Sequence, residues 1–241
     1  MHLYIDLGNT CLKWQLANHT SIHITGIGEL EKFKTFIDEH NIEKCFISCS
    51  LGSHRQQTLA SVQAILPHNI LLQHPTVQET MLGLTHSYLD ATQLGIDRWL
   101  AMLAVWHTER QPSLIIDSGS ALTLDAIDNN GQHLGGYILP GIAMHYTNLA
   151  SVLPAATNTA INHNAWQTDF GHTTYECIEN GMHSLYLNFL QHQIDKFSQG
   201  YCQSRVYITG GNGKFLAKKL QLDYAQNLVL DGLKTYFLHK D

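Results

Sequence analysis

Short runs of β-forming residues alternate with longer amphipathic segments along the first hundred residues. Residues 2–7 and 11–17 flank Gly8-Asn9-Thr10, which has the composition of a tight turn and predicts an antiparallel hairpin. The continuing alternation of strands and helices is typical of an α/β protein. The pattern predicts strands near Ile22–Thr25, Cys45–Leu51 and Ile70–Gln73, and helices over Glu29–His40, Arg55–Leu66 and Ile96–Thr108.

The same order of elements starts again near residue 110. Asp6–Thr10 and Asp117–Ala121 share the form Asp-x-Gly-polar-small, and this repeat sets the boundary, since no Pro- or Gly-rich linker marks it. We predict two halves, 1–110 and 111–241, each a mixed sheet flanked by helices. The second half should contain strands at Leu114–Ser118, Ala121–Ile127, through Leu139 and at Arg205–Thr209, and helices near 141–153, 173–193, 213–221 and 226–239.

Composition and charge narrow the class of function. The 241 residues include 14 Lys plus Arg against 20 Asp plus Glu, a net charge of −6 without a basic tract to follow a nucleic-acid backbone. The N-terminus lacks the pattern of a secretory signal, and the longest strongly apolar run, Trp99–Trp106, is far shorter than the roughly 20 residues that cross a bilayer. Five cysteines suit a reducing compartment. We expect a cytoplasmic protein with no nucleic-acid or membrane partner.

The repeated Asp-x-Gly motif carries the first candidate chemistry. A strand that ends in Asp and continues into Gly and a hydroxyl residue lets backbone N–H groups approach an anion closely. One copy alone is more often a turn in which the Asp caps its own backbone, but two copies in equivalent positions favour loops that grip a triphosphate. Because a carboxylate repels phosphate, the Asp is expected to hold a hydrated Mg²⁺ that bridges phosphate oxygens.

Two further positions could serve a nucleotide. Lys13 interrupts the second strand of the hairpin, where it could point toward the β- or γ-phosphate or be a solvated strand lysine. Ile208–Asn212 ends a strand with adjacent glycines, which suits a flat ring or ribose but equally a plain strand-to-helix turn. A Walker loop is excluded at Gly213-Lys214, because Phe215 follows where Ser or Thr belongs.

Gly95-Ile96-Asp97-Arg98 begins the longest predicted helix of the first half and places a carboxylate and a guanidinium at its N-terminus. In isolation the tetrapeptide could be a helix cap with a surface arginine. Beside two phosphate loops, the same pair supplies an orienter for an acceptor hydroxyl and a cation for an acidic acceptor.

Taken together, these motifs resemble the set found in type III pantothenate kinases. Asp6–Lys13 reads Asp-x-Gly-Asn-Thr-x-x-Lys, and Gly95–Arg98, Asp117–Asp125 and Gly135–Gly141 follow in the family's order. The resemblance implies an actin-like (ribonuclease H-like) duplicated fold and ATP-dependent 4′-phosphorylation of pantothenate, the first step of coenzyme A synthesis. It also implies Mg²⁺, a monovalent cation (K⁺ or NH₄⁺) and a homodimer.

The dimer contact is expected at Gly135–Gly141 and the following helix, around Ile142, Leu149 and Val152, unless these side chains are buried within one subunit.

The resemblance also implies roles for single residues. Asp97 would accept the hydroxyl proton, and Asp117 would be the monovalent-cation site. Ser120 stands where the family usually has Thr and keeps the hydroxyl donor. Thr174 resembles a substrate-contacting Thr, with Thr173 adjacent. Thr209–Asn212 corresponds to the family's third glycine motif. ATP would be bound by Asp6, Leu7, Gly8, Asn9, Thr10, Cys11, Leu12, Lys13 and Ser120, and pantothenate by Tyr88, Gly95, Ile96, Asp97, Arg98 and Thr174.

Two other functions compete with this interpretation. Another kinase of the same superfamily could act on a sugar or a carboxylate, but Gly95–Arg98 with Tyr88 seven residues upstream is not a general superfamily feature. A transcription accessory factor is the non-enzymatic alternative, since relatives of the family have carried that description. The acidic net charge and the intact carboxylates Asp6 and Asp97 argue against direct action on DNA.

Overall fold

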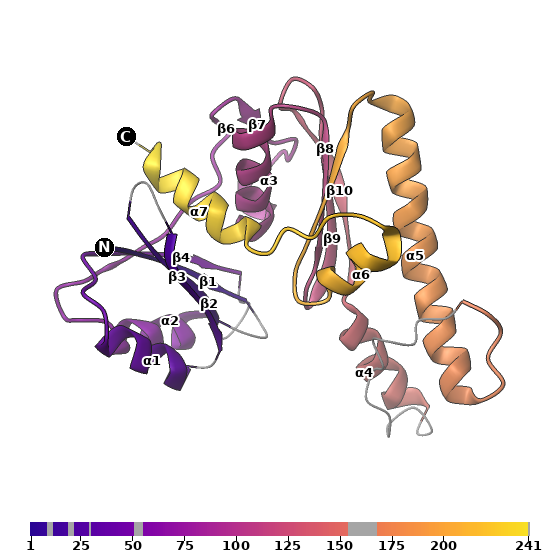
Figure 1. Ribbon diagram of the computed structural model, residues 1–241, viewed down its shortest axis with the longest axis horizontal. Coiled ribbons are helices and arrows are strands. Elements are labelled where there is room, and N and C mark those ends of the chain that lie inside the picture. The colour runs from indigo at the N-terminus through magenta and orange to yellow at the C-terminus, as the bar shows by residue number, and fades with distance from the viewer. Residues whose placement is uncertain (9–11, 19–21, 29, 51–54, 154–167, 241) are drawn as a thin grey trace. The chain divides into compact units, whose positions relative to one another are not determined.

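The computed structural model describes residues 1–8, 12–18, 22–28, 30–50, 55–153 and 168–240 (Figure 1). The chain divides into two compact units, Met1–Arg110 with Asn227–Asp241, and Gln111–Gln226. The repeated motif predicted that everything after residue 110 belongs to the second half. In the structure the last helix, α7 (Leu228–Leu238), packs instead with the first unit, against α3 (Ile96–Glu109). None of the described helices is long and apolar enough to span a membrane.

The first unit contains a five-stranded sheet with the strand order β3-β2-β1-β4-β5. β1 (His2–Leu7), β2 (Leu12–Ala17) and β3 (Ile22–Gly28) form an antiparallel meander. β4 (Lys44–Cys49) lies parallel to β1, and β5 (Leu72–Gln73) lies parallel to β4. The hairpin predicted at the start of the chain is therefore present.

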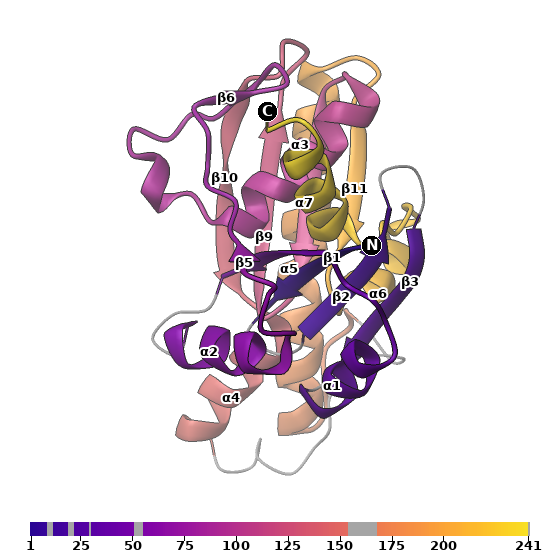
Figure 2. The ribbon, with the colours of Figure 1, turned by 90° about the vertical axis from the view of Figure 1, so that its left-hand side faces the viewer.

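The two faces of this sheet bury different side chains because alternate residues point to opposite sides. Leu3, Ile5 and Leu7 of β1 join one apolar cluster with residues of α1 (Leu30–Asp38) and α2 (Arg55–Ile65). Figure 2 shows both helices on the same side of the strands. On the opposite face Tyr4 stacks on Phe46 at 5.1 Å, and Phe46 stacks on Phe237 of α7 at 4.1 Å. The last helix thus covers the face that α1 and α2 leave open.

The second unit contains a four-stranded sheet with the order β10-β9-β8-β11. β8 (Ser113–Ser118), β9 (Ala121–Ile127) and β10 (His133–Pro140) are antiparallel, and β11 (Arg205–Thr209) is parallel to β8. Its helices are α4 (Ile142–Val152), α5 (Thr174–Gly200) and α6 (Gly213–Leu220).

The core of this unit includes Tyr186 of α5 and Leu216 of α6. It also includes Ile142 of α4, and Leu149 packs against the same cluster. Burial within one subunit, the alternative left open for this helix, therefore holds for Ile142.

Both sheets repeat one topology. In each, three antiparallel strands are followed, after helical or irregular segments, by a strand that adds in parallel to the first of the three, so β3-β2-β1-β4 corresponds to β10-β9-β8-β11. The turns β1–β2 and β8–β9, which carry the two Asp-x-Gly motifs, consequently occupy equivalent positions. The predicted duplication is present in the fold itself.

Three small elements were not predicted. β6 (Thr80–Met81) and β7 (Leu84–Thr85) form a short hairpin, and the 3₁₀ helix η1 (Ala91–Gln93) follows it. They occupy the loop that leads to the Gly95–Arg98 motif.

Candidate active site

The first phosphate-loop candidate is the turn between β1 and β2. Asp6 and Lys13 are directly opposite each other in the antiparallel pair and point to the same face of the sheet. Asp6 is 8% exposed, whereas Lys13 is half-buried. The turn residues Asn9, Thr10 and Cys11 lie outside the described residues. The structure thus brings together a buried carboxylate and a lysine where the two strands enter the turn.

This arrangement fits a magnesium–nucleotide site. Mg²⁺ is usually bound by one or two carboxylates together with waters and substrate phosphates rather than by an all-protein cage. Asp6 offers such a carboxylate, and Lys13 offers a positive charge for a phosphate oxygen.

Two other titratable groups of the first unit are affected by burial. Deeper on the same face as Asp6, burial raises the pKa of Tyr4 to about 12, so its phenol stays neutral at physiological pH. Burial also raises the pKa of Asp231 on α7, against the lowering effects of the Gln15 amide and of Lys234.

The second loop lies at the end of β8, where Asp117 is opposite Thr209 of β11. Gly210 has a φ of +91°, and a Cβ atom there would collide with Asp117 Oδ1 and lie 2.6 Å from the Ser118 carbonyl carbon. Only glycine fits this position. The Asn212 N–H donates to the Ser118 oxygen at 2.9 Å. The second Asp-x-Gly loop and the third glycine motif are therefore packed directly together.

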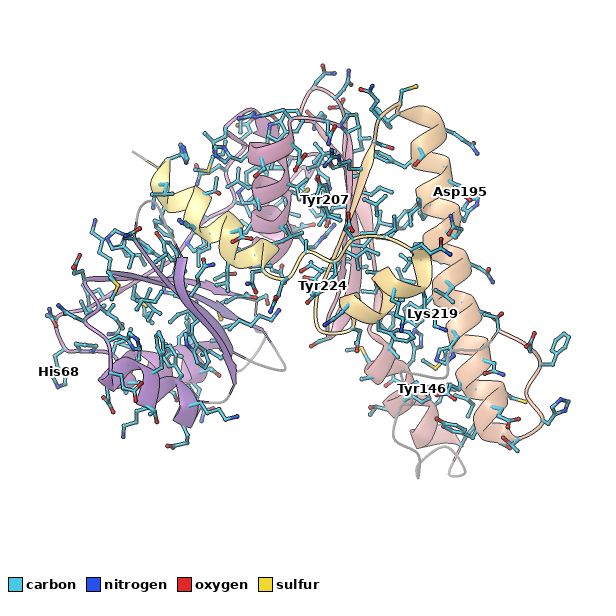
Figure 3. All side chains as sticks on the ribbon, viewed as in Figure 1. His68, Tyr146, Asp195, Tyr207, Lys219 and Tyr224 are labelled. Carbon is cyan, nitrogen blue, oxygen red and sulfur yellow. The ribbon has the colours of Figure 1, made fainter. Side chains whose placement is uncertain are left out.

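Ser120 is fixed by the end of the Gly135–Gly141 motif. The Gly141 N–H donates to the Ser120 carbonyl oxygen at 3.0 Å, and a Cβ on Gly141 would collide with that oxygen. Beside the glycine turn of β11, the Tyr224 hydroxyl donates to the Gly210 carbonyl at 3.2 Å. Tyr224 is labelled in Figure 3, in the segment between α6 and α7. Three sequence motifs of the second unit thus meet at one end of its sheet.

Gly95–Arg98, the candidate acceptor-binding motif, lies at the start of α3. Gly95 is the residue before the first helical turn, and a Cβ there would lie 2.6 Å from Asp97 Oδ1, so glycine leaves room for that carboxylate. The same oxygen accepts a hydrogen bond from the Arg98 backbone N–H at 2.8 Å. Arg98 is 6% exposed and donates from Nη1 to the Tyr88 hydroxyl at 2.7 Å, with its guanidinium 5.7 Å from the centre of the Tyr88 ring. Tyr88, Asp97 and Arg98 therefore form one cluster.

Contacts that the sequence does not predict hold the loop before α3 in place. Arg110, just after α3, donates from Nη1 to the Leu82 carbonyl at 2.5 Å and lies over the Trp106 ring at 5.3 Å. Asp90 accepts hydrogen bonds from the backbone N–H and the hydroxyl of Thr92 at 2.9 and 2.7 Å, which lower the pKa of Asp90. These contacts fasten both ends of the loop that carries Tyr88.

The structure distinguishes the two threonines at the start of α5. Thr173 is the N-cap: its hydroxyl accepts from the Glu176 N–H at 3.2 Å, and the Glu176 carboxylate accepts from the Thr173 N–H at 3.2 Å. Thr174 is the first helical residue and is exposed. The Thr-x-x-Glu spacing is a capping-box signal, and it could have identified Thr173 as the N-cap from the sequence.

Comparisons with known proteins agree with the motifs. A family model for type III pantothenate kinase matches residues 2–196. A type III pantothenate kinase of Marinobacter nauticus is 32% identical over 239 residues, covering 97% of each chain. One from Alcanivorax borkumensis is 30% identical over 248 residues, also with 97% of each chain covered.

Solved structures extend the comparison. A Campylobacter jejuni protein described as a candidate Baf family transcriptional activator superimposes with a TM-score of 0.61 at 25% identity, over 99% of this chain and 98% of that one. A candidate N-acetylmannosamine kinase of Listeria monocytogenes gives a TM-score of 0.52 at 12% identity, over 99% of both chains, and supports the fold alone. The fold is that of the actin-like ATPases, and the chain belongs to the type III pantothenate kinase family.

Proposed function

We propose that this chain transfers the γ-phosphoryl group of ATP to the 4′-hydroxyl of pantothenate, with Asp97 as the residue that orients the hydroxyl. Membership of the family supports the reaction, including the use of ATP and a divalent cation. The observation that carries the residue assignment is the Tyr88–Asp97–Arg98 cluster at the start of α3. Incubation with ATP, Mg²⁺ and pantothenate, followed by mass spectrometry for phosphopantothenate, tests the activity.

The phosphate-binding side of the reaction is assigned to the two Asp-x-Gly loops. Bound Mg²⁺ would neutralise charge that develops on the phosphate oxygens. Asp6 would hold the hydrated ion, Lys13 would contact the β- or γ-phosphate, and Ser120 would donate its hydroxyl to a phosphate oxygen. Residues 7–12 would supply backbone N–H groups. Because phosphoryl transfer passes through a loose transition state, positioning and charge neutralisation account for most of the catalysis.

The acceptor side is assigned to the α3 cluster. Asp97 would accept a hydrogen bond from the 4′-hydroxyl and take its proton late, when the new O–P bond has formed, since a carboxylate is a weak base toward an alcohol. Arg98 is buried and held by Tyr88, so it presents a fixed positive charge for the pantothenate carboxylate. Gly95 and Ile96 would shape the entrance to the pantothenate site, and the exposed hydroxyl of Thr174 would supply a further contact with pantothenate.

A monovalent cation is proposed at Asp117, the family's potassium-site position. Replacing potassium with a large organic cation at constant ionic strength should sharply lower turnover, because such an ion cannot approach the Asp117 carboxylate as closely as potassium can. Initial rates measured in both salts check this. Equal rates would remove the assignment.

A homodimer is proposed through the edge of the second sheet. β10 is an edge strand of the described sheet, and it exposes Leu134, Tyr137 and Ile138, with Met144 exposed on the next helix. Apolar side chains on an unpaired strand edge favour association with another copy. Sedimentation at micromolar concentration should show a species of twice 27.1 kDa, and a single 27.1 kDa species would contradict the proposal.

The name given to the Campylobacter jejuni structure keeps a transcription accessory role as the second candidate. We favour the enzyme acting in the cytoplasm without a nucleic-acid or membrane partner, because the net charge is −6 and the candidate carboxylates are intact. Neutralising both Asp6 and Asp97 in cells separates the two functions. Growth that depends on this chain should be lost if it is the kinase and retained if its role is not enzymatic.

A further inference from the structure

One row of side chains crosses the sheet of the first unit at the candidate magnesium site. In the strand register, Asp6 of β1 is opposite Lys13 of β2 on one side and opposite Ser48 of β4 on the other. Leu7 and Cys49 belong to the cluster with α1 and α2, so Asp6 and Ser48 point to the other face, with Lys13. The row on this face is therefore Lys13, Asp6, Ser48.

Ser48 is unusual within this row. Its exposed fraction is 0%, and its hydroxyl has no hydrogen-bond partner among the residues that the structure describes. Leaving a buried hydroxyl unpaired costs free energy, so a serine that only filled space would be less stable than alanine here. The neighbouring row shows the alternative, since its positions next to Ser48 and Asp6 are the stacked rings of Phe46 and Tyr4.

The surroundings of Ser48 join the two sides of the reaction within one unit. β4 pairs with β1, which ends in the phosphate turn, and α3, which begins with the acceptor motif, packs against β4. Asp6, whose carboxylate is assigned to the phosphate-binding site, is therefore the residue next to Ser48 across the sheet. The Ser48 hydroxyl can rotate toward that carboxylate.

We propose that Ser48 is a positioning residue for Asp6: when magnesium and ATP bind, its hydroxyl donates a hydrogen bond to the Asp6 carboxylate and fixes the oxygen that faces the hydrated ion. The inference rests on the proposed role of Asp6 in that site. Partners that orient a metal-binding carboxylate typically change metal affinity or activity by about 10–100-fold when they are removed.

Calorimetric titration with ATP, in the presence of Mg²⁺ and again with EDTA, tests the proposal on the full chain. Ser48→Ala should weaken binding of magnesium–ATP by about 10–100-fold and leave metal-free ATP binding unchanged. Its thermal midpoint without ligand should be unchanged or higher, because an unpaired buried hydroxyl is removed. Ser48→Cys, which is close in size and only a weak donor, should weaken magnesium–ATP binding in the same direction.

Ser113→Ala is the matched control. Ser113 is also fully buried, at the start of β8, but its hydroxyl donates to the Gln111 carbonyl at 3.0 Å. Its removal should lower the thermal midpoint and leave magnesium–ATP affinity unchanged. The two serines therefore predict opposite patterns of stability and binding.

The possible results distinguish the role of Ser48 from the role of Asp6 in the magnesium site. Unchanged magnesium–ATP affinity in Ser48→Ala overturns the inference, and so does an equal loss with and without Mg²⁺, which indicates packing alone. Asp6→Asn should lose the magnesium-dependent gain, with little further loss in the double variant. If Asp6→Asn binds magnesium–ATP normally, the proposed site is wrong; if it fails to bind while Ser48→Ala binds normally, only the inference on Ser48 is wrong.

Discussion

Asp97→Asn should lower the turnover of pantothenate by on the order of 10²–10⁴-fold, the usual cost of removing a general base. The amide is nearly the same size, and its oxygen can still accept the hydrogen bond from the Arg98 N–H that Asp97 makes at 2.8 Å. The loss of stability should stay within about 1 kcal/mol. The variant therefore removes proton acceptance while leaving the start of α3 in place.

Turnover, ATP affinity and urea unfolding measured together check this prediction. ATP affinity should be nearly unchanged in Asp97→Asn, because the nucleotide is assigned to other loops. Asp6→Asn should instead weaken the use of magnesium–ATP while acceptor binding stays largely intact. Asp128→Asn is the matched control: Asp128 accepts from the N–H groups of Asn130 and Gln132, both at 2.8 Å, in a turn, and its loss should not change turnover. Near-normal turnover in folded Asp97→Asn would show that Asp97 is not the proton acceptor and has only a structural role at the start of α3.

Local chemistry made much of the fold predictable. The hairpins could be read because β-forming runs flank glycine turns, and α3 because a long apolar segment follows Gly95. The repeated Asp-x-Gly motif predicted the duplication, which appears as the same strand order in both sheets. Tyr88 and Arg98 were placed together by resemblance, and their hydrogen bond at 2.7 Å shows the contact.

Sequence patterns did not predict which elements contact one another in the folded chain. An amphipathic pattern shows that α7 has a buried face but not which sheet covers it, so its place in the first unit needed the structure. The β6–β7 hairpin escaped notice because its strands have two residues each, too few for a periodic pattern. Ser48 was missed because strand register, rather than sequence distance, brings it beside Asp6.

Gly232→Ala should lower the free energy of unfolding by about 3 kcal/mol, near the upper end of overpacking costs. Gly232 is buried in α7, and a Cβ atom there would collide with the carbonyl oxygen of Leu100, in the second turn of α3, and lie 2.9 Å from the Leu100 Cα. Backbone atoms cannot rotate away as a side chain can, so the two helices would have to separate. Alanine's better helix propensity returns only about 0.5–1 kcal/mol.

Gly181→Ala in α5 supplies the control with the opposite sign. Gly181 is also inside a helix, but it is exposed, and a Cβ there would meet nothing within 4 Å. Only the propensity remains, so this change should raise the free energy of unfolding by about 0.5–1 kcal/mol. Urea unfolding of both variants measures the difference. Because α3 carries Asp97 at its start, Gly232→Ala should also lower turnover below what the unfolded fraction explains. A Gly232→Ala protein as stable as Gly181→Ala would mean that α3 and α7 are not in close contact.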